Sequence, residues 1–190
     1  MSQDDDDGDL MSRLQTGNDG ALDVLMHRWQ VPVRRFAERH LQNAAEAADV
    51  AQDTFVRVYR HRQQFRTGSQ FSTWLFSIAL NLCRDRARRS RTRPVEYLDE
   101  VHLAEASEEQ GAENRGAGPH VVLMRHETAT AVRAAVEALP EPLKTAVLLC
   151  EFQDLSHADA ATISHCTPKA VETRLYRARE QLRKALARYF

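Results

Sequence analysis

The sequence predicts an all-α fold made of two small helical domains joined by a flexible acidic linker. Ala, Leu, Arg and Glu are abundant, whereas the 190 residues include only 7 Gly and 6 Pro, a composition that favours helix over sheet. Hydrophobic residues make up 43% of the chain, enough for packed cores. Helical periodicity is interrupted once, by an acidic stretch that contains glycine. We therefore place the domains at residues 10–94 and 121–190 and the linker at 95–120.

The N-terminal residues 1–9, MSQDDDDGD, show no apolar periodicity and are expected to be disordered. This acidic start is unlike a secretory signal, and no apolar run approaches the ~18–20 residues of a membrane span. Cys83, Cys150 and Cys166 are widely spaced, which suggests neither a disulfide framework nor a zinc site. We therefore expect a cytoplasmic protein without membrane insertion.

The stretch DVAQDTFVRVYRH, residues 49–61, has the periodicity of an amphipathic helix. Its inward side is formed by Val50, Thr54, Phe55 and Val58. Its opposite side carries Asp49, Gln52, Asp53 and Arg57. This polar set is not an evident metal site or acid/base pair, and taken alone it fits ordinary charged helix surface.

A further helix is predicted to begin at about Ser72, after a loop that contains Gly68. Its apolar stripe consists of Leu75, Ile78, Ala79 and Leu82. Its polar face consists of Ser77, Asn81, Arg84 and Arg88. Residues 84–93 include six Arg and one Asp, a bias that favours contact with phosphates over a bare solvated face.

Four aromatic residues cluster at the start of this helix: Phe65, Phe71, Trp74 and Phe76. Cations beside aromatic rings suit phosphate contact combined with base stacking, as on single-stranded nucleic acid. Trp74 and Phe76 fit a core role better. Phe71, in the loop, is the better candidate for touching a base.

The linker differs in composition from both domains. Between residues 96 and 120 it has seven Asp or Glu and one Arg, so 7 − 1 gives six net negative charges. Its glycines and Pro119 are typical of a flexible tether.

Residues 155–190 predict a helix-turn-helix. Ser156 and Asp159 form a capping box that starts a short helix to about Ile163. Thr167 can cap the next helix, and Pro168 suits its first position. The second helix buries one stripe, formed by Val171, Leu175, Ala178, Leu182 and Leu186.

From Lys169 to Arg188 this second helix carries seven Lys or Arg against two Glu, a net charge of +5. Such helices enter the major groove of DNA and read base edges with side chains near their N-terminus. The candidate readers are Lys169, Glu172, Thr173, Arg174, Tyr176 and Arg177. A solvated amphipathic helix is the alternative that periodicity alone leaves open.

Two other functions, a metal site and a regulator that binds duplex DNA alone, fit the sequence less well. A metal site from Cys150, His157, His165 and Cys166 is disfavoured, because Cys150 lies in an apolar helix and His157 at a capped helix start. No phosphate-binding glycine loop or nucleophile–base set occurs, so we expect no catalytic residue, metal or cofactor. A helix-turn-helix regulator that binds duplex DNA alone would not need the polar face of residues 49–61.

Four stretches together give the chain a family resemblance: DVAQDTFVRVYRH, FSTWLFSIALNLCRDRARR, ALPEPLKTAVLLCEFQDLSHADAATI and TPKAVETRLYRAR. In this order they resemble a bacterial sigma factor of the extracytoplasmic-function (ECF) type, over nearly the whole chain except the acidic N-terminus and the linker. The turn before Thr167 departs from the family pattern, since His165 stands where Gly is usual.

The resemblance implies a non-enzymatic subunit that directs RNA polymerase to promoters. Asp49, Gln52, Asp53 and Arg57 would dock on the coiled coil of the largest polymerase subunit, and the C-terminal domain would lie by the flap region. The −10 promoter element would be read and opened, with one base flipped out, by Arg66, Ser69, Phe71, Ser77, Asn81, Arg84 and Arg88. The helix after Thr167 would read the −35 element. The linker would thread toward the RNA exit path, and an anti-sigma factor would be a further partner.

Overall fold

The computed structural model describes residues 3–92 and 119–189, with side chains described from Asp6 to Ser90 and from Glu127 to Tyr189. The described residues form helices joined by turns, and no strand occurs among them, which confirms the all-α prediction. The N-terminal domain comprises α1 (Gln3–Gln15), α2 (Gly20–Leu41), α3 (Ala44–Arg60), the 3-10 helix η1 (Arg62–Gln64) and α4 (Phe71–Thr92). The C-terminal domain comprises α5 (Pro119–Glu137), α6 (Glu141–Cys150), α7 (His157–Ser164) and α8 (Pro168–Leu186).

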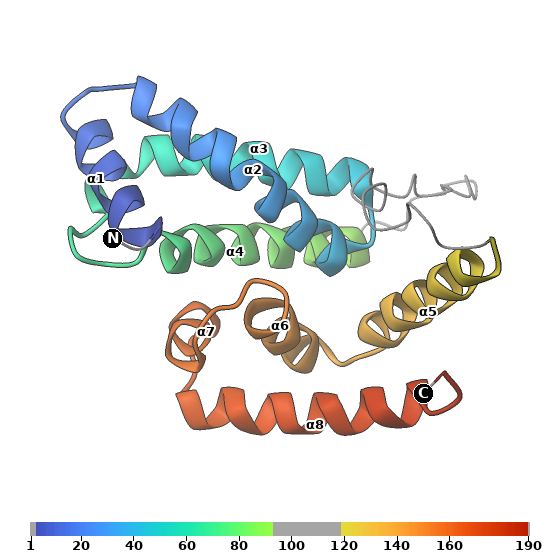
Figure 1. The fold of residues 1–190 in the computed structure, drawn as a ribbon. Helices are drawn as coiled ribbons and strands as arrows, with labels where there is room; N and C mark the ends of the chain where they lie inside the picture. The colour runs from blue at the N-terminus through green and yellow to red at the C-terminus, as the bar shows by residue number, and fades with distance from the viewer. Residues whose placement is uncertain (1–2, 93–118, 190) are drawn as a thin grey trace.

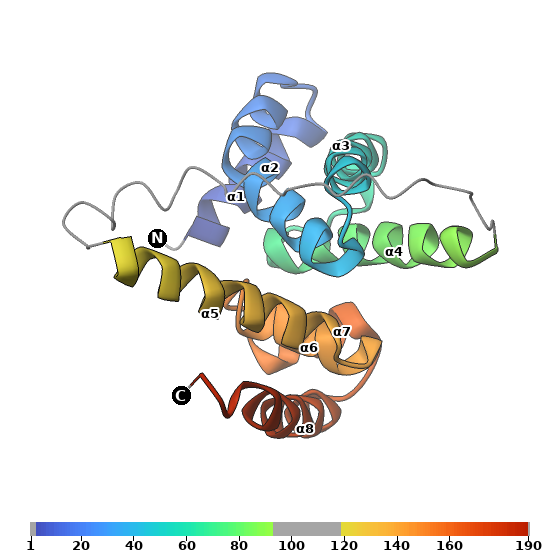
Figure 2. The ribbon, with the colours of Figure 1, turned by 90° about the vertical axis from the view of Figure 1, so that its right-hand side faces the viewer.

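The helices form two layers (Figure 1). In the upper layer α2, α3 and α4 lie side by side, with α1 across one end. Each of the three buries an apolar stripe, as expected for amphipathic helices. The largest fully buried side chains of these three helices are Phe36, Phe71, Phe76, Leu25, Leu75 and Leu80. In the lower layer α8 lies farthest from the N-terminal domain (Figure 2).

The disorder predicted for residues 1–9 is wrong from Gln3 onward, because α1 begins there. Asp7 is fully buried, accepts a hydrogen bond from Trp29 Nε1 at 2.7 Å and pairs with Arg28. Acidic residues are favourable in the first turns of a helix, since they face the positive end of its dipole. The cation and the indole that hold them come from α2, so the local sequence does not reveal them. The inner face of α1 is buried at Leu10, Met11 and Leu14.

The helix-turn-helix of the C-terminal domain is formed by α7 and α8. Ser156 Oγ accepts a hydrogen bond from the Asp159 amide at 3.1 Å, which caps α7 as predicted. His165 ends α7 with a φ of 52°, in the left-handed region that the turn requires. Thr167 Oγ1 then caps α8 by accepting from the Ala170 amide at 3.2 Å. The local signals therefore place both helices correctly.

The two domains pack on each other where α6 and α7 meet α2 and α4 (Figures 1 and 2). Lys144 Nζ donates to the backbone carbonyl of His40 at 3.0 Å, and burial lowers the pKa of this lysine. The Arg39 guanidinium lies 4.5 Å from the centroid of the Phe152 ring, within the range of a cation–π contact. Polar and charged groups therefore carry much of this interface.

Most of the predicted linker, residues 95–118, lies outside the described residues. Pro119 and His120, also assigned to the linker, already belong to α5. Over the described ranges no helix is long and apolar enough to cross a membrane.

Candidate nucleic-acid interface

The outer face of α3 is the first candidate surface. Its inner side is buried as predicted, at Val50, Thr54, Phe55 and Val58. The four predicted surface residues, Asp49, Gln52, Asp53 and Arg57, are all exposed on the opposite side. The amphipathic division of this helix is therefore confirmed.

Arg86 of α4 joins the two carboxylates of that face, a role that sequence reading missed. Its Nη1 lies 3.1 Å from Asp49 Oδ2, and its Nη2 lies 3.0 Å from Asp53 Oδ2. Burial opposes the charge of Arg86, but the hydrogen bonds to both carboxylates more than offset this and raise its pKa. The fork of one guanidinium thus fixes both carboxylates at their spacing on α3.

The loop between η1 and α4 is the second candidate surface. Residues 66–70 are all exposed, and they include the predicted contacts Arg66 and Ser69. The Ser69 amide donates to the Arg66 carbonyl at 3.0 Å, which closes a tight turn. Gly68 sits in this turn with a φ of +88°, a conformation that favours glycine.

The prediction that Phe71 touches a base is wrong. Phe71 is the first residue of α4, continues its apolar stripe into the core and is 0% exposed. Its ring lies 6.1 Å from that of Trp29, 6.2 Å from that of Phe65 and 6.3 Å from that of Trp74. Phe76 is buried and Trp74 is half-buried against the same core, in line with their expected core role. The aromatic cluster therefore belongs to the hydrophobic core that adjoins the loop.

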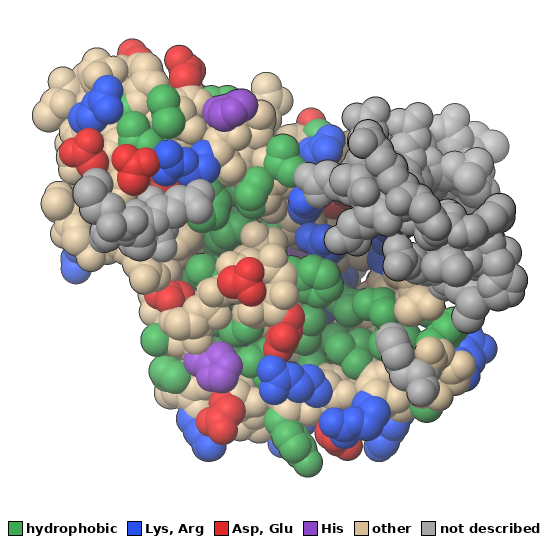
Figure 3. Space-filling model, viewed as in Figure 1, with side chains coloured by type: hydrophobic (Ala, Val, Ile, Leu, Met, Phe, Trp, Pro, Cys, Tyr) green, Lys and Arg blue, Asp and Glu red, His purple; other side chains and the backbone are tan. Residues whose placement is uncertain are grey.

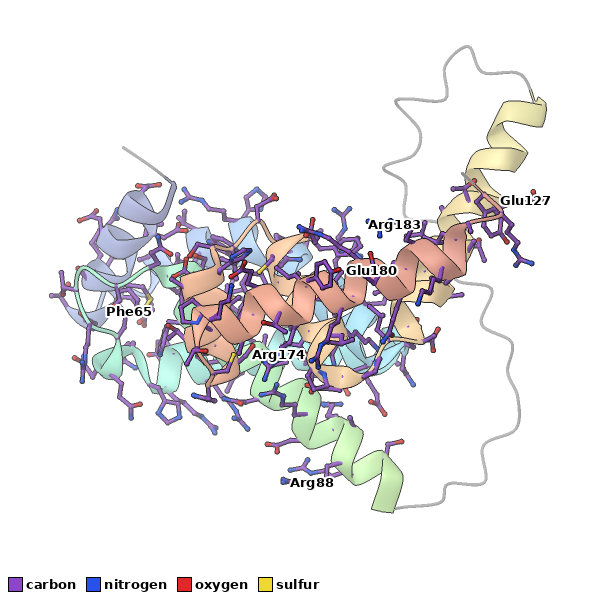
Figure 4. All side chains as sticks on the ribbon, turned by 90° about the horizontal axis from the view of Figure 1, so that it is seen from below. Phe65, Arg88, Glu127, Arg174, Glu180 and Arg183 are labelled. Carbon is purple, nitrogen blue, oxygen red and sulfur yellow. The ribbon has the colours of Figure 1, made fainter. Side chains whose placement is uncertain are left out.

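The polar face of α4 lies next to that loop. Asn81 and Arg88 are exposed, whereas Ser77 and Arg84 are half-buried. Ser77 Oγ donates to the Trp74 carbonyl at 2.6 Å. Figure 4 shows Arg88 near the end of α4 that projects beyond the C-terminal domain. The predicted residues do share one helix face, but they differ in accessibility.

Arg84 is half-buried because the C-terminal domain meets it. Its Nε lies 3.0 Å from Glu141 Oε1, at the start of α6. His40 Nε2 is 3.9 Å from the same oxygen, an ion-pair distance that is too long for a hydrogen bond. His40, then Arg84 and Thr145 lower the pKa of Glu141 to about 2, against its partial burial.

A second carboxylate of the C-terminal domain meets the start of α4. Thr73 Oγ1 donates to Asp159 Oδ1 at 2.9 Å. In the amide orientation that satisfies both groups, Gln70 also donates to the Asp159 carboxylate, at 3.0 and 3.1 Å. The Asp159 carboxylate thus accepts from Ser156 Oγ in the first turn of α7 and also contacts the end of the 66–70 loop.

The outer face of α8 is the third candidate surface. Lys and Arg side chains follow this helix along the lower edge of the molecule, mixed with acidic ones (Figure 3). Tyr176 is 67% exposed and Arg177 is also exposed. Lys169 Nζ pairs with Glu172 Oε2 at 2.8 Å, and Thr173 Oγ1 donates to the Lys169 carbonyl.

Arg174 differs from the other predicted readers on α8. It is half-buried, and its Nη1 donates to Cys166 Sγ at 3.3 Å, across the turn of the helix-turn-helix. No group of three His, Cys, Asp or Glu that could hold a metal ion occurs in the described part of the chain.

Two protein families match the chain, one in each domain. Residues 25–93 match Sigma-70 region 2, and residues 129–182 match Sigma-70, region 4. The first match contains the α3 face, the loop and α4, and the second contains the helix-turn-helix.

Curated relatives match over nearly the whole chain. RNA polymerase sigma-H factor of Pseudomonas aeruginosa is 35% identical, over 98% of this chain and 96% of the relative. ECF RNA polymerase sigma-E factor of Escherichia coli is 32% identical, over 96% of this chain and 95% of the relative.

Solved structures also match. CnrH in complex with the cytosolic domain of CnrY superposes with a TM-score of 0.69 at 26% identity, covering 95% of this chain and 97% of CnrH. The sigma factor RpoE in complex with the anti-sigma factor NepR from Bartonella quintana gives a TM-score of 0.66 at 22% identity, over 87% of this chain and 96% of RpoE. The latter supports the fold alone.

Proposed function

The chain belongs to the sigma-70 family, in its ECF group, and acts in promoter-specific transcription initiation; from that premise we propose how its surfaces divide the work. The outer face of α3 binds core RNA polymerase. The 66–70 loop and the polar face of α4 read and open the −10 element, and α8 reads the −35 element. The protein itself performs no catalysis.

The polymerase-binding role rests on Asp49, Gln52, Asp53 and Arg57. They are exposed, and they stand on a helix whose other side is packed into the core. Arg86 holds the carboxylates of Asp49 and Asp53 at a fixed spacing. A partner surface with complementary charge can therefore bind them without first ordering them. The largest-subunit coiled coil of the polymerase is the proposed partner here, with the flap region as the partner of the C-terminal domain.

The −10 role divides between base capture and strand binding. Arg66 and Ser69 in the loop, with Ser77 and Asn81 on α4, offer hydrogen bonds to an extruded base, and the loop is flanked by the aromatic cluster of the core. Arg84 and Arg88 hold the phosphates of the same strand. Phe71 takes no direct part, since its ring is in the core.

The −35 role rests on the exposed first turns of α8. Lys169, Glu172, Thr173, Tyr176 and Arg177 are exposed there, and α8 is the second helix of a helix-turn-helix. Arg177 can donate to guanine, and Glu172 can accept from the amino group of cytosine. Arg174, half-buried behind these residues, would support the turn and reach a phosphate.

One observation carries the assignment of the −10 role: the exposed 66–70 loop stands directly before a helix whose polar face continues with Asn81 and Arg88. In the packed arrangement of the two domains, Arg84 forms an ion pair with Glu141, and Thr73 donates a hydrogen bond to Asp159. Reading of the −10 element therefore requires the domains to separate. A polymerase would favour the separated state, and an anti-sigma factor that grips both domains would favour the packed one.

The test compares promoter opening with recruitment. Holoenzyme with the double substitution Ser69→Ala and Asn81→Ala should bind duplex promoter nearly as the unsubstituted protein does, because α8 is unchanged. Permanganate footprinting should show fewer unpaired thymines in the −10 region, and a template with a pre-melted −10 bubble should restore part of the transcription. Gln30→Ala, at an exposed position on α2, is the matched control. Normal opening in the double variant would contradict the role of the loop.

A further inference from the structure

We infer that α1 positions the base-capturing loop: Gln15 fixes the start of the 66–70 loop, and Asp7 fixes its end through Trp29. Residues 3–15 lie outside the matched region 2, which begins at residue 25. The inference rests on the proposed role of the loop in −10 recognition, and it adds Gln15 as a positioning residue for that role.

The start of the loop is held by one side-chain amide. Gln15 Nε2 donates to the Arg62 carbonyl at 2.7 Å and to the Phe65 carbonyl at 2.9 Å. Both hydrogens of the amide are thereby used on the segment that leads into Arg66. Gln63 Nε2 returns a hydrogen bond to the Gln15 carbonyl at 2.9 Å, so η1 and the end of α1 are tied in both directions.

The end of the loop is held by a chain of contacts from Asp7. Asp7 Oδ2 accepts the Trp29 Nε1 hydrogen at 2.7 Å, and Asp7 is 0% exposed. Arg28 pairs with Asp7, and its Nη2 lies 2.7 Å from Asp6 Oδ2. The Trp29 ring meets the Phe71 ring edge-on, with centroids 6.1 Å apart. Phe71 is the first residue after the loop, so the orientation of Trp29 fixes the point where the loop ends.

The two anchors, Asp7 and Gln15, belong to the same helix. Asp7 and Gln15 stand about two helical turns apart on α1, and Met11 and Leu14 between them are fully buried. The buried rings that flank the loop, Phe65 and Phe71, lie 6.2 Å apart.

The loop itself is exposed, and beside the internal turn closed by the Ser69 amide and the Arg66 carbonyl it is held at its two ends. A loop presented in one conformation loses less conformational entropy when it captures a base, which favours binding and discrimination. The α1 anchors therefore act on base capture without touching the nucleic acid.

The test uses substitutions that keep the shape of the side chain. Gln15→Glu replaces the donating amide with a carboxylate oxygen that faces two carbonyls, and Gln30→Glu, at an exposed position on α2, is the matched control. Holoenzyme made with each variant is titrated with a fluorescent single-stranded −10 oligonucleotide. We expect Gln15→Glu to bind about tenfold more weakly and to lose preference at the captured base, and Gln30→Glu to stay within about twofold.

A second pair of variants tests the other anchor. Asp7→Asn keeps an acceptor for Trp29 Nε1, whereas Asp7→Leu removes it. Asp7→Leu should reproduce the loss of base preference, and Asp7→Asn should retain most of it. Binding of the duplex −35 element is measured in parallel, because it should stay unchanged in every variant that is folded.

The outcomes separate the two claims. If Ser69→Ala with Asn81→Ala leaves oligonucleotide binding unchanged, the proposed role of the loop fails. If that double variant binds weakly while Gln15→Glu and Asp7→Leu bind normally, the positioning role of α1 is overturned. It is also overturned if both α1 variants weaken −35 binding and −10 binding equally, because α1 would then only support the fold.

Discussion

Glu141→Gln should shift the protein toward separated domains. Glu141 begins α6 and reaches across the domain interface, with its Oε1 3.0 Å from Arg84 Nε and 3.9 Å from His40 Nε2. An amide at this position keeps the shape of the side chain but loses the negative charge that pairs with the Arg84 guanidinium. The packed arrangement should therefore become less favourable, while the helices of each domain remain intact.

The magnitude follows from the pKa of Glu141. If the whole difference between its ordinary pKa of 4.5 and about 2 counted toward domain packing, it would be worth roughly 3 kcal/mol. Part of the depression comes from Thr145 on the same helix and would persist in the separated state. The side chain is also 43% exposed, so solvent screens the pair. We expect about 1 kcal/mol, which is roughly a fivefold change in the packing equilibrium.

The assay is energy transfer between one dye on each domain, measured at neutral pH and over a salt series. Glu151→Gln is the matched control, because Glu151 is also 43% exposed but pairs with Arg179 inside the C-terminal domain, at 2.6 Å. Glu141 favours packing above its ordinary pKa, and this contribution is lost as the pH falls from 4.5 toward 2. Equal energy transfer in Glu141→Gln and the unsubstituted protein, or an equal change in Glu151→Gln, would refute the reasoning.

Three other outcomes are expected. Asp53→Arg should weaken binding to core RNA polymerase by about tenfold in a titration of labelled enzyme, whereas Asp23→Arg, at an exposed position on α2, should not. Arg177→Ala should relax the preference at one or two −35 base pairs by about 1–3 kcal/mol; the same consensus from randomised −35 sequences would exclude base reading. Leu175→Ala, at a site only 1% exposed, should lower the free energy of unfolding by about 2–5 kcal/mol in denaturant titrations, and a smaller loss would mean that the C-terminal core is loosely packed.

Features that depend on neighbouring residues could be predicted from the sequence. The caps at Ser156 and Thr167 are local hydrogen bonds, and they define α7 and α8 in the structure as they do in the sequence. His165 stands where the resembled family usually has Gly, and it adopts the left-handed conformation that such a turn needs, with a φ of 52°. Helical periodicity likewise separates the buried and exposed sides of α3.

Features that depend on residues far apart in the chain could not be predicted from the sequence. The acidic run of α1 was interpreted as disordered because its stabilising partners, Arg28 and Trp29, lie more than twenty residues away. Phe71 was assigned to the nucleic acid because the helix was predicted to begin one residue too late. An aromatic residue at the first position of a helix, four residues before the buried Leu75, continues the inward stripe, so helical periodicity places Phe71 in the core once the helix begins there.

The domain interface was the least predictable feature, and it has the clearest functional consequence. Glu141 and Asp159 are separated from Arg84 and Thr73 by more than fifty residues, so no local pattern pairs them. In the fold they place two carboxylates on the face of α4 that carries the proposed −10 contacts. A carboxylate and a DNA phosphate both bind a guanidinium through anionic oxygens. If this face of α4 carries the −10 contacts as we propose, the C-terminal domain and promoter DNA compete for it, and reading of the −10 element requires Glu141 and Asp159 to leave that face first.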